Sequence, residues 1–162
     1  DLINFFLYTA YDDCVKYKLL AGTFANKIKS RIFIHIVEQY RNTLEKALNS
    51  SKNFNPPESL KELIALAKDH VSLGNITGEG WLLTAEMISL IKHGINNIIC
   101  LQPFGCLPNH IVGKGMIREL LHSSPQANIV PIDCDAGASE VNQLNRIKLM
   151  LAVAFEKIKE HK

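Results

Sequence analysis

The sequence predicts an α/β fold, in which a small parallel sheet with flanking helices follows a helical N-terminal half. In the first half, apolar residues recur at mixed three- and four-residue spacings, which is typical of amphipathic helices. In the second half, short continuous apolar runs alternate with helical segments, as in a βαβ unit whose strands are buried on both faces. A chain of 162 residues fits one domain with a real core. Within it we expect a helical arm over residues 1–57 and an α/β lobe over residues 58–162.

The N-terminal half is predicted to contain three helices. The first spans about residues 5–20, and the second spans about residues 23–49 with a long apolar periodicity. Residues 50–57 are predicted to form a loop because they are rich in Ser, Asn and Pro. A third helix then runs over residues 57–70, since a proline followed by a glutamate is favourable at a helix start.

The C-terminal half is predicted to alternate helices and strands. We expect a helix over 84–93, a strand over 97–102, a helix over 108–122, a strand over 128–133 and a helix over 139–159. Residues 71–75 are a further candidate strand. These elements predict a small parallel sheet of Rossmann or flavodoxin-like type, in which ligands bind beyond the carboxyl ends of the strands.

Composition and charge exclude several classes of function. The formal charge of +2 is small and the basic residues are scattered, so we predict no nucleic-acid partner. No apolar segment is long enough to cross a bilayer and no signal peptide is visible, so we predict no membrane partner. The four cysteines lie far apart, which favours a reducing cytoplasm, and Cys14 and Cys100 are expected in the core. Because the chain begins with Asp1 directly in apolar pattern, we interpret it as a piece of a longer protein.

Three glycine-rich loops contain the candidate site residues. PFGCLPN, residues 103–109, follows the first predicted strand, and CDAGAS, residues 134–139, follows the second. Because parallel strands end at the same edge of a sheet, these two loops are expected to lie near each other. GNITGEGW, residues 74–81, has the same character and precedes a helix. We expect it on the same rim.

Cys106 is the main candidate for a reactive residue. It follows Gly105 in a turn and precedes Pro108, which suits the first position of a helix. A thiol at that position lies near the positive end of the helix dipole, which favours the thiolate that binds metal. Gly113 and Gly115 lie inside the predicted helix, at a cost of roughly 1 kcal/mol each. They indicate that a neighbouring helix, a cluster or a ligand approaches the backbone closely.

The other loop residues have a functional and an ordinary interpretation. His110 is a ligand or proton carrier, or else a partly exposed polar residue. Glu79 and Trp81 line a pocket, or else the tryptophan is packed in the core beside a surface glutamate. Asp135 or Ser139 is expected to cap the last helix. A third candidate role is the binding of a small anion by backbone N–H groups at the helix N-termini at Pro108 and Ser139. The candidate pocket residues are Glu79, Trp81, Gly105, His110, Gly113, Lys114 and Ser139.

Four motifs in a fixed order resemble a known family. They are GEGWLLTAEM at 78–87, QPFGCLPNH at 102–110, GKGM at 113–116 and GASEVNQLNRIKLM at 137–150. Together they are similar to the C-terminal part of the large activases linked to 2-hydroxyacyl-CoA dehydratases, long fusions that are related to double-cubane-cluster proteins. The strong resemblance covers about half of the chain, and the helical first half resembles the family only loosely.

The resemblance implies an iron–sulfur redox system. In that family, ATP hydrolysis in a separate activase domain drives a low-potential electron into a cluster held by dehydratase-like domains. The electron serves radical dehydration of CoA esters or other difficult reductions. Carried over by its motif, Cys106 in PFGC is the candidate cluster and metal ligand, whereas Cys134 stands in no such motif.

A cluster normally binds several thiolates, so one candidate ligand is not enough. The resemblance therefore implies further ligands in other domains of the parent chain, or in an activase or dehydratase-like subunit. ATP would bind in a separate domain of the parent, and we expect the fragment alone to be catalytically inactive. The alternative function is a non-catalytic structural or interaction module of a larger multidomain protein.

Overall fold

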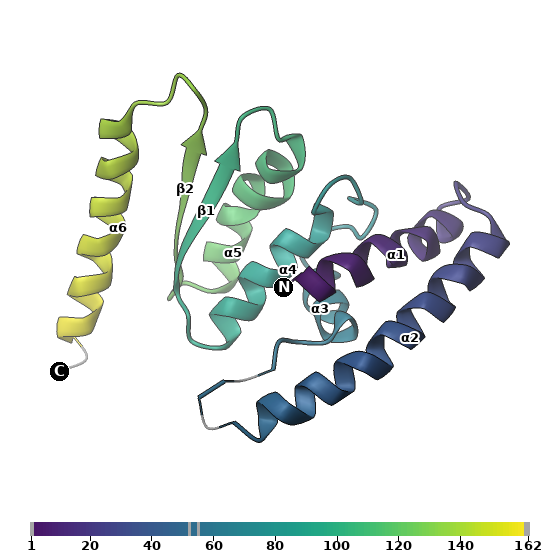
Figure 1. The fold of residues 1–162 in the computed structure, drawn as a ribbon. Helices are drawn as coiled ribbons and strands as arrows, with labels where there is room; N and C mark the ends of the chain where they lie inside the picture. Colours follow the sequence, from purple (N-terminus) through teal and green to yellow (C-terminus); the bar gives the residue numbers. More distant parts are fainter. Residues whose placement is uncertain (1, 52, 55, 161–162) are drawn as a thin grey trace.

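The N-terminal half of the chain is a helical hairpin with two further helices packed on its inner side (Figure 1). The computed structural model describes residues 2–51, 53–54 and 56–160. The helices are α1 (Leu2–Lys18), α2 (Phe24–Asn49), α3 (Leu60–Ala67) and α4 (Gly80–Lys92). No helix among the described residues is both long enough and apolar enough to cross a membrane.

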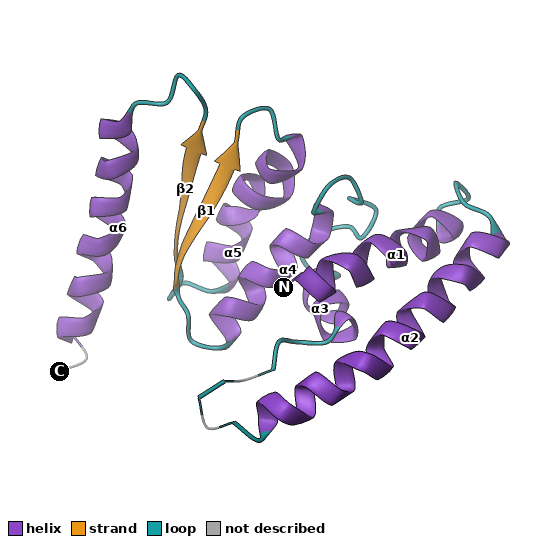
Figure 2. Ribbon diagram, in the orientation of Figure 1, coloured by secondary structure: helices purple, strands orange, loops and turns teal. Residues whose placement is uncertain are grey.

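The C-terminal half contains a two-stranded parallel sheet with helices on either side (Figure 2). Its elements are β1 (Asn97–Pro103), η1 (Asn109–Gly113), η2 (Lys114–Met116), α5 (Ile117–Ser123), β2 (Asn128–Cys134) and α6 (Glu140–Glu160). The strands pair in parallel from Asn97 opposite Asn128 to Pro103 opposite Cys134. In Figure 1, α4 and α5 lie on one side of the sheet and α6 on the other. The predicted mixture of a helical half with a small parallel sheet is therefore confirmed.

The third helix begins and ends differently from the prediction. Ser59 and Glu62 form a capping box, because each side chain accepts a hydrogen bond from the backbone N–H of the other residue. The helix therefore begins at Leu60, not at Pro57, and it ends at Ala67. The cap also lowers the pKa of Glu62, since the N–H of Ser59 stabilises its carboxylate.

Two other predicted elements also differ. Residues 71–75 form turns and no strand, and the next helix begins at Gly80, four positions before the predicted start. The single helix expected over residues 108–122 is divided into the π-helix η1, the 3₁₀ turn η2 and the α-helix α5. Lys52 and Asn55 of the predicted loop 50–57 lie outside the described residues.

The core consists of two apolar clusters that share α4. The first joins α1, α3 and the start of α4 through residues such as Leu7, Leu63 and Trp81. The second joins the end of α4 to both strands and α5 through residues such as Met87, Ile98 and Leu120. The thiols of Cys14 and Cys100 are both buried, as predicted.

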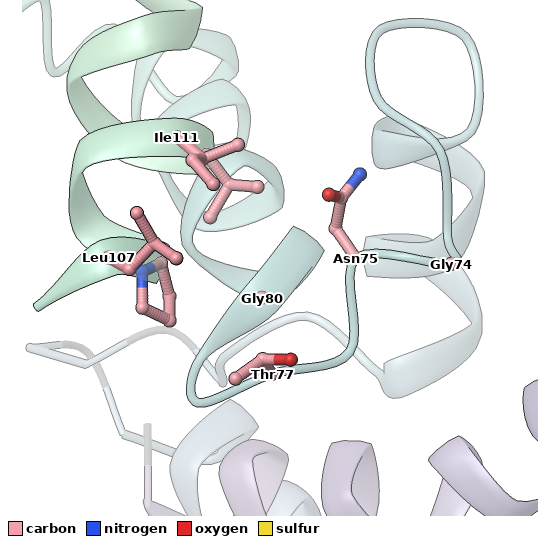
Figure 3. A pocket seen from close by; sticks show the side chains of 8 residues that line it. Gly74, Asn75, Thr77, Gly80, Leu107 and Ile111 are labelled. Atoms are coloured by element: carbon pink, nitrogen blue, oxygen red, sulfur yellow. The ribbon is translucent and has the colours of Figure 1, made fainter.

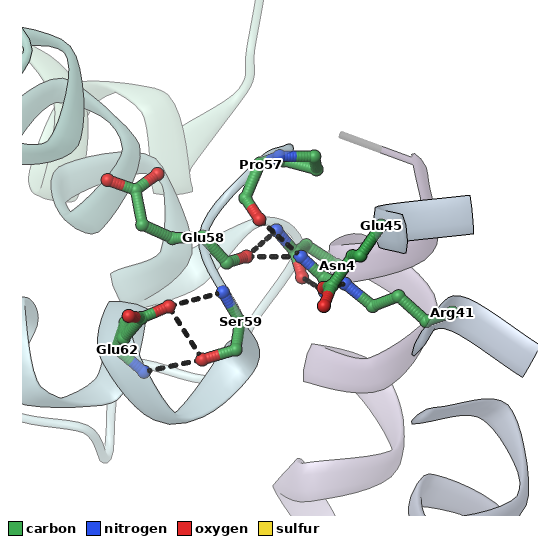
Figure 4. A network of polar contacts seen from close by, with 7 residues as sticks. All are labelled: Asn4, Arg41, Glu45, Pro57, Glu58, Ser59 and Glu62. Carbon is green, nitrogen blue, oxygen red and sulfur yellow. Dashed lines mark hydrogen bonds and ion pairs between the residues drawn. The ribbon is translucent and has the colours of Figure 1, made fainter. Parts of the chain in front are cut away.

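A buried arginine connects the hairpin to the segment before α3 (Figure 4). Arg41 on α2 is 3% exposed and donates to the Oε1 atom of Glu45 at 2.7 Å and to the Oδ1 atom of Asn4 on α1. It also donates to the backbone carbonyls of Pro57 and Glu58, at 2.9 and 2.5 Å. One guanidinium therefore holds α1, α2 and the approach to α3 together.

Candidate functional site

β1 ends in a tight turn that presents Cys106 at the edge of the sheet. The backbone N–H of Cys106 donates to the carbonyl of Pro103 at 3.1 Å and closes a β-turn. Gly105 has a φ of +68°, a conformation that residues with a side chain rarely adopt. No atom lies within 4 Å of a Cβ added there, so this glycine is needed for the backbone and not for space.

The thiol of Cys106 is half-buried and hydrogen-bonded. The side-chain amide of Asn109, itself only 7% exposed, donates to the sulfur of Cys106 at 2.9 Å. Sequence reasoning missed Asn109 as a site residue. The available signal was an amide three residues after a cysteine at a helix start, a spacing that places both side chains on one face.

The segment behind Cys106 differs from the single helix that the sequence predicts. A helical segment begins at Leu107, directly after Cys106, and changes from π-helix in η1 to a 3₁₀ turn in η2 and then to the α-helix α5. The expectation that a helix dipole favours the thiolate of Cys106 therefore stays a prediction.

Gly113 is required by packing inside the fold. A Cβ at Gly113 would lie 2.9 Å from the Cδ2 atom of Leu83 on α4 and 3.1 Å from the sulfur of Cys100 on β1. A Cβ at Gly115 would lie 3.1 Å from the carbonyl oxygen of His110. The predicted approach of a neighbouring helix therefore holds at Gly113, where α4 lies against the backbone, whereas at Gly115 the close atom belongs to the same helical segment.

Two of the three glycine-rich loops meet beside Cys106. Together they line a cavity of about 160 Å³ (Figure 3), whose walls are Gly74, Asn75, Thr77, Gly80, Leu107, Pro108, Ile111 and Val112. A Cβ at Gly78 would lie 3.0 Å from the Cγ atom of Pro108, so the loops are in close contact. The hydroxyl of Thr84 on α4 donates to the carbonyl of Val112 at 2.5 Å and fixes η1 against α4.

The third loop lines a different cavity. Lys114 of η2 pairs with Asp133 of β2 at 3.1 Å, and the side chain of Gln143 donates to the carbonyl of Asp133 at 2.6 Å. The cavity here measures about 300 Å³ and is lined by Asp133, Asp135, Gly137, Ala138, Ser139, Asn142, Gln143 and Arg146. Ser139 is exposed just before α6. The wall contains the carboxylates of Asp133 and Asp135 and the guanidinium of Arg146, and the charge of Asp133 is balanced by Lys114.

The remaining candidate residues are dispersed. Glu79 and His110 are exposed, whereas Trp81 is fully buried with its ring 5.1 Å from that of Tyr8 in an edge-on arrangement. The packed interpretation of Trp81 therefore holds. Among the described residues, no group of three or more His, Cys, Asp or Glu side chains could hold a metal ion.

Two titratable groups are buried behind the loop 74–80. Burial raises the pKa of Tyr8, and the charges of Asp12 and Glu79 raise it further. Burial also raises the pKa of Asp12 to about 7, although Lys16 opposes this shift. The hydroxyl of Tyr8 and the Oδ1 atom of Asp12 have no hydrogen-bond partner in the described part of the chain.

The cysteines differ in their access to solvent. Burial raises the pKa of Cys100, which keeps that thiol protonated and inert. Cys106 is half-buried and Cys134 is exposed. Only these two sulfurs, both near the edge where the parallel strands end, are positioned to meet another molecule.

Comparisons of the chain with protein-family models, with curated proteins and with solved structures found no match. The resemblance described above therefore stays a prediction.

Proposed function

We propose that this chain supplies one lobe of an iron–sulfur site in a larger redox protein, with Cys106 as a thiolate ligand. The observation on which the proposal depends is the position of this sulfur, half-buried on a tight turn beyond the carboxyl end of a parallel strand. Ligands of parallel α/β sheets bind beyond that end. The proposal also includes the fold: further strands of the parent protein would extend this two-stranded sheet to a sheet of Rossmann or flavodoxin-like type.

The surroundings of Cys106 fit one ligand of a cluster. Hydrogen bonds to cluster sulfurs tune the reduction potential, and the amide of Asn109 already donates to this sulfur at 2.9 Å. Phe104, Leu107 and Ile111 around the turn are 82%, 65% and 50% exposed. Exposed apolar residues that surround a polar centre are suited to a second lobe that closes over it and excludes water.

The chain alone offers too few ligands, so the site would be shared. A cluster needs about four ligands, and no group of three potential ligands exists among the described residues. The others would come from other domains of the parent chain, or from an activase or dehydratase-like subunit. When bound, the cluster would store and pass on a low-potential electron, with ATP hydrolysed in a separate domain. All four thiols are free, which suits a reducing cytoplasm.

The test is anaerobic reconstitution of the full-length parent with ferrous iron and sulfide. We expect Cys106→Ser to lose most of the bound iron and the charge-transfer absorption, whereas Cys134→Ser keeps both. Alkylation of Cys106, read by mass spectrometry, should be blocked by reconstitution in the unchanged protein. Equal iron content in the two serine variants would remove the ligand assignment.

The second candidate function is a non-catalytic interaction module. It is favoured by the same exposed apolar side chains at Phe104, Leu107 and Ile111, which suit docking whether or not a cluster is present. In this case the chain should dock onto the rest of its parent without iron. Cys106→Ser should then leave docking unchanged, whereas Leu107→Glu should abolish it.

A further inference from the structure

One leucine at the end of α1 has an unfavourable backbone conformation. Leu20 has a φ of +61°, and it is the only residue other than glycine with a positive φ in the described part of the chain. The N–H of Leu20 donates to the carbonyl of Tyr17 at 3.3 Å. The N–H of Ala21 donates to the carbonyl of Lys16 at 2.9 Å. These two hydrogen bonds form a Schellman motif with Leu20 at the left-handed position, where glycine is usual and a larger side chain adds strain.

Contacts inside the chain do not compensate for the strain at Leu20. Its side chain is 95% exposed, the largest exposed fraction of any large apolar side chain among the described residues. Strained backbone positions cluster at binding sites, where the strain serves a function. An exposed leucine at a position where glycine suits the backbone therefore indicates a contact with a partner outside the chain.

Leu20 belongs to a small apolar tip of the hairpin. The connection between α1 and α2 lies at the outer end of the hairpin, on the opposite side of the molecule from α6 (Figure 1). Its two apolar neighbours are each 59% exposed, and we call the three residues the docking tip: Leu19, Leu20 and Phe24. A Cβ at Gly22 would lie 2.8 Å from the backbone nitrogen of Tyr17, so the connection folds back tightly on the end of α1.

Positive charge is concentrated around the docking tip. Residues 14–37 include five basic residues and no acidic one. The five lie near the end of α1 or near the start of α2, and the hairpin brings them to one end of the molecule. The whole chain has a formal charge of only +2, so the rest of it is net acidic. We call these five residues the basic cluster: Lys16, Lys18, Lys27, Lys29 and Arg31.

The basic cluster is available to an anionic partner. Among the ion pairs of the described residues, none joins Lys18, Lys29 or Arg31 to a carboxylate. The ammonium of Lys27 lies 5.8 Å from the centre of the Phe24 ring, which places this charge beside the docking tip.

Part of the basic cluster lines a cavity. This cavity measures about 320 Å³ and is lined by residues of α1, α2 and α3. Among the described residues of its wall, only Glu38 is acidic. Four cations around one carboxylate attract an anionic group such as a phosphate. The basic side chains of the wall are Lys18, Lys27, Arg31 and Lys61.

An anionic membrane surface fits these features better than a protein partner does. A standard protein interface uses about 20–30 residues on each side, whereas the docking tip has three apolar side chains. A bilayer interface accepts a few apolar side chains at the acyl boundary and attracts basic side chains to its anionic headgroups. Lysine side chains suit this arrangement, because their stems lie along apolar surface while their ammonium groups stay in water.

We propose that the hairpin of α1 and α2 docks onto membranes that contain anionic lipids, with the docking tip in the interface and the basic cluster on the headgroups. The prediction of no membrane partner rested on the lack of a spanning segment and of a signal peptide, and a tip in the interface requires neither. The proposal goes beyond the cluster function and does not depend on it, because the docking tip and the basic cluster contain none of the residues around Cys106.

Sedimentation of the 162-residue chain with lipid vesicles tests the docking. The chain should bind vesicles of phosphatidylglycerol and phosphatidylcholine roughly tenfold more tightly than vesicles of phosphatidylcholine alone. Lys29→Glu should weaken binding to the anionic vesicles severalfold, whereas Lys148→Glu, at an exposed position on α6, should not. Added salt should also weaken the binding, because it screens exposed charges.

Substitution of Leu20 separates a structural role from a binding role. Leu20→Gly removes backbone strain, so it should raise the midpoint of urea unfolding. The same change should weaken binding to the anionic vesicles roughly tenfold, because the apolar side chain that enters the interface is lost. Leu20→Asn, which also tolerates a left-handed backbone, should weaken binding in the same way. Leu149→Ala removes a leucine that is 69% exposed on α6 and should leave binding unchanged.

Three results would overturn the proposal. The first is no binding to the anionic vesicles, which would mean that the docking tip meets a different partner. The second is equal binding to both kinds of vesicle, which would remove the role of the basic cluster. The third is unchanged binding of Leu20→Gly, which would place the contact elsewhere. Leu20→Gly should keep the iron content of the reconstituted parent, so the docking proposal and the cluster proposal fail separately.

Discussion

Three glycines shape the candidate site, each for a different reason. Gly105 adopts a positive φ with open space around it, so only its backbone conformation requires glycine. Gly113 has an ordinary negative φ of −95° but is pressed against Leu83 and Cys100. Gly80 combines both constraints, because its φ is +46° and an added Cβ would overlap the carbonyl of Asn75.

Substitution of Gly80 should be the most damaging of the three. We expect Gly80→Ala to lower the free energy of unfolding by roughly 3 kcal/mol or more, because it adds backbone strain to a steric overlap. Gly137→Ala is the matched control, since its Cβ would meet no atom within 4 Å, and it should change stability by less than about 0.5 kcal/mol. Urea unfolding measures both. Similar stabilities would show that loop 74–80 can move away from α1.

Asp12 should make stability depend on pH. Its pKa is about 7 in the folded protein and near 3.8 when unperturbed, so between these values the unfolded chain is ionised while the folded chain keeps its proton. The stability that comes from protonated Asp12 is therefore complete below about pH 4 and lost as pH rises through 7. At about 1.4 kcal/mol per pKa unit, the loss amounts to a few kcal/mol.

Asp12→Asn removes this titration. We expect its stability relative to the unchanged chain to rise between pH 5 and pH 8 in urea unfolding. Asp69→Asn, at an exposed carboxylate, should follow the unchanged chain at both values. Parallel curves for Asp12→Asn and the unchanged chain would show that this carboxyl is ionised when folded.

At the scale of elements, Arg41 holds the hairpin and α3 together. Arg41→Met keeps much of the apolar stem but leaves Asn4 and the carbonyls of Pro57 and Glu58 without their donor. We expect a loss of roughly 3 kcal/mol in the free energy of unfolding, since buried acceptors are left unpaired. Arg31→Met, at an exposed position on the same helix, should change stability by less than about 0.5 kcal/mol. Equal losses in thermal or urea unfolding would contradict this role.

The order and type of most elements could be predicted because they depend on local patterns. Apolar periodicity placed α1, α2 and α6, and continuous apolar runs placed both strands. The break in the segment after β1 could not be predicted in this way. It occurs at Gly113, which closely approaches Leu83 and Cys100, residues that are distant from it in sequence. The cap at Ser59 and Glu62 was present in the sequence, and a search for S-x-x-E would have found it.

The candidate site was predictable only in part for the same reason. The position of Cys106 beyond β1 followed from parallel topology, and so did the proximity of the strand ends. The contact of loop 74–80 with Pro108 and the pairing of Lys114 with Asp133 depend on tertiary packing. Trp81 lies in the core because α1 supplies Tyr8 against its ring, which no local pattern near the tryptophan indicates.

At the scale of the whole molecule, much apolar surface stays uncovered. For example, Leu101 on β1 and Leu149 on α6 are 56% and 69% exposed. Parallel sheets are normally covered on both faces, and this two-stranded sheet is covered on one face more completely than on the other. Both proposed functions use exposed apolar surface of this kind for association with another part of the parent protein.

The sharing of α4 between the two apolar clusters has a consequence for how the chain folds. Trp81 and Ala85 at one end of α4 complete the first cluster, and Met87 and Ile91 toward the other end complete the second. Neither apolar cluster stays packed once α4 unfolds, because each loses the side chains that α4 contributes. The hairpin and the sheet should therefore be lost in a single cooperative step, and a proteolytic cut in the connection between α2 and α3 should not release a stable half.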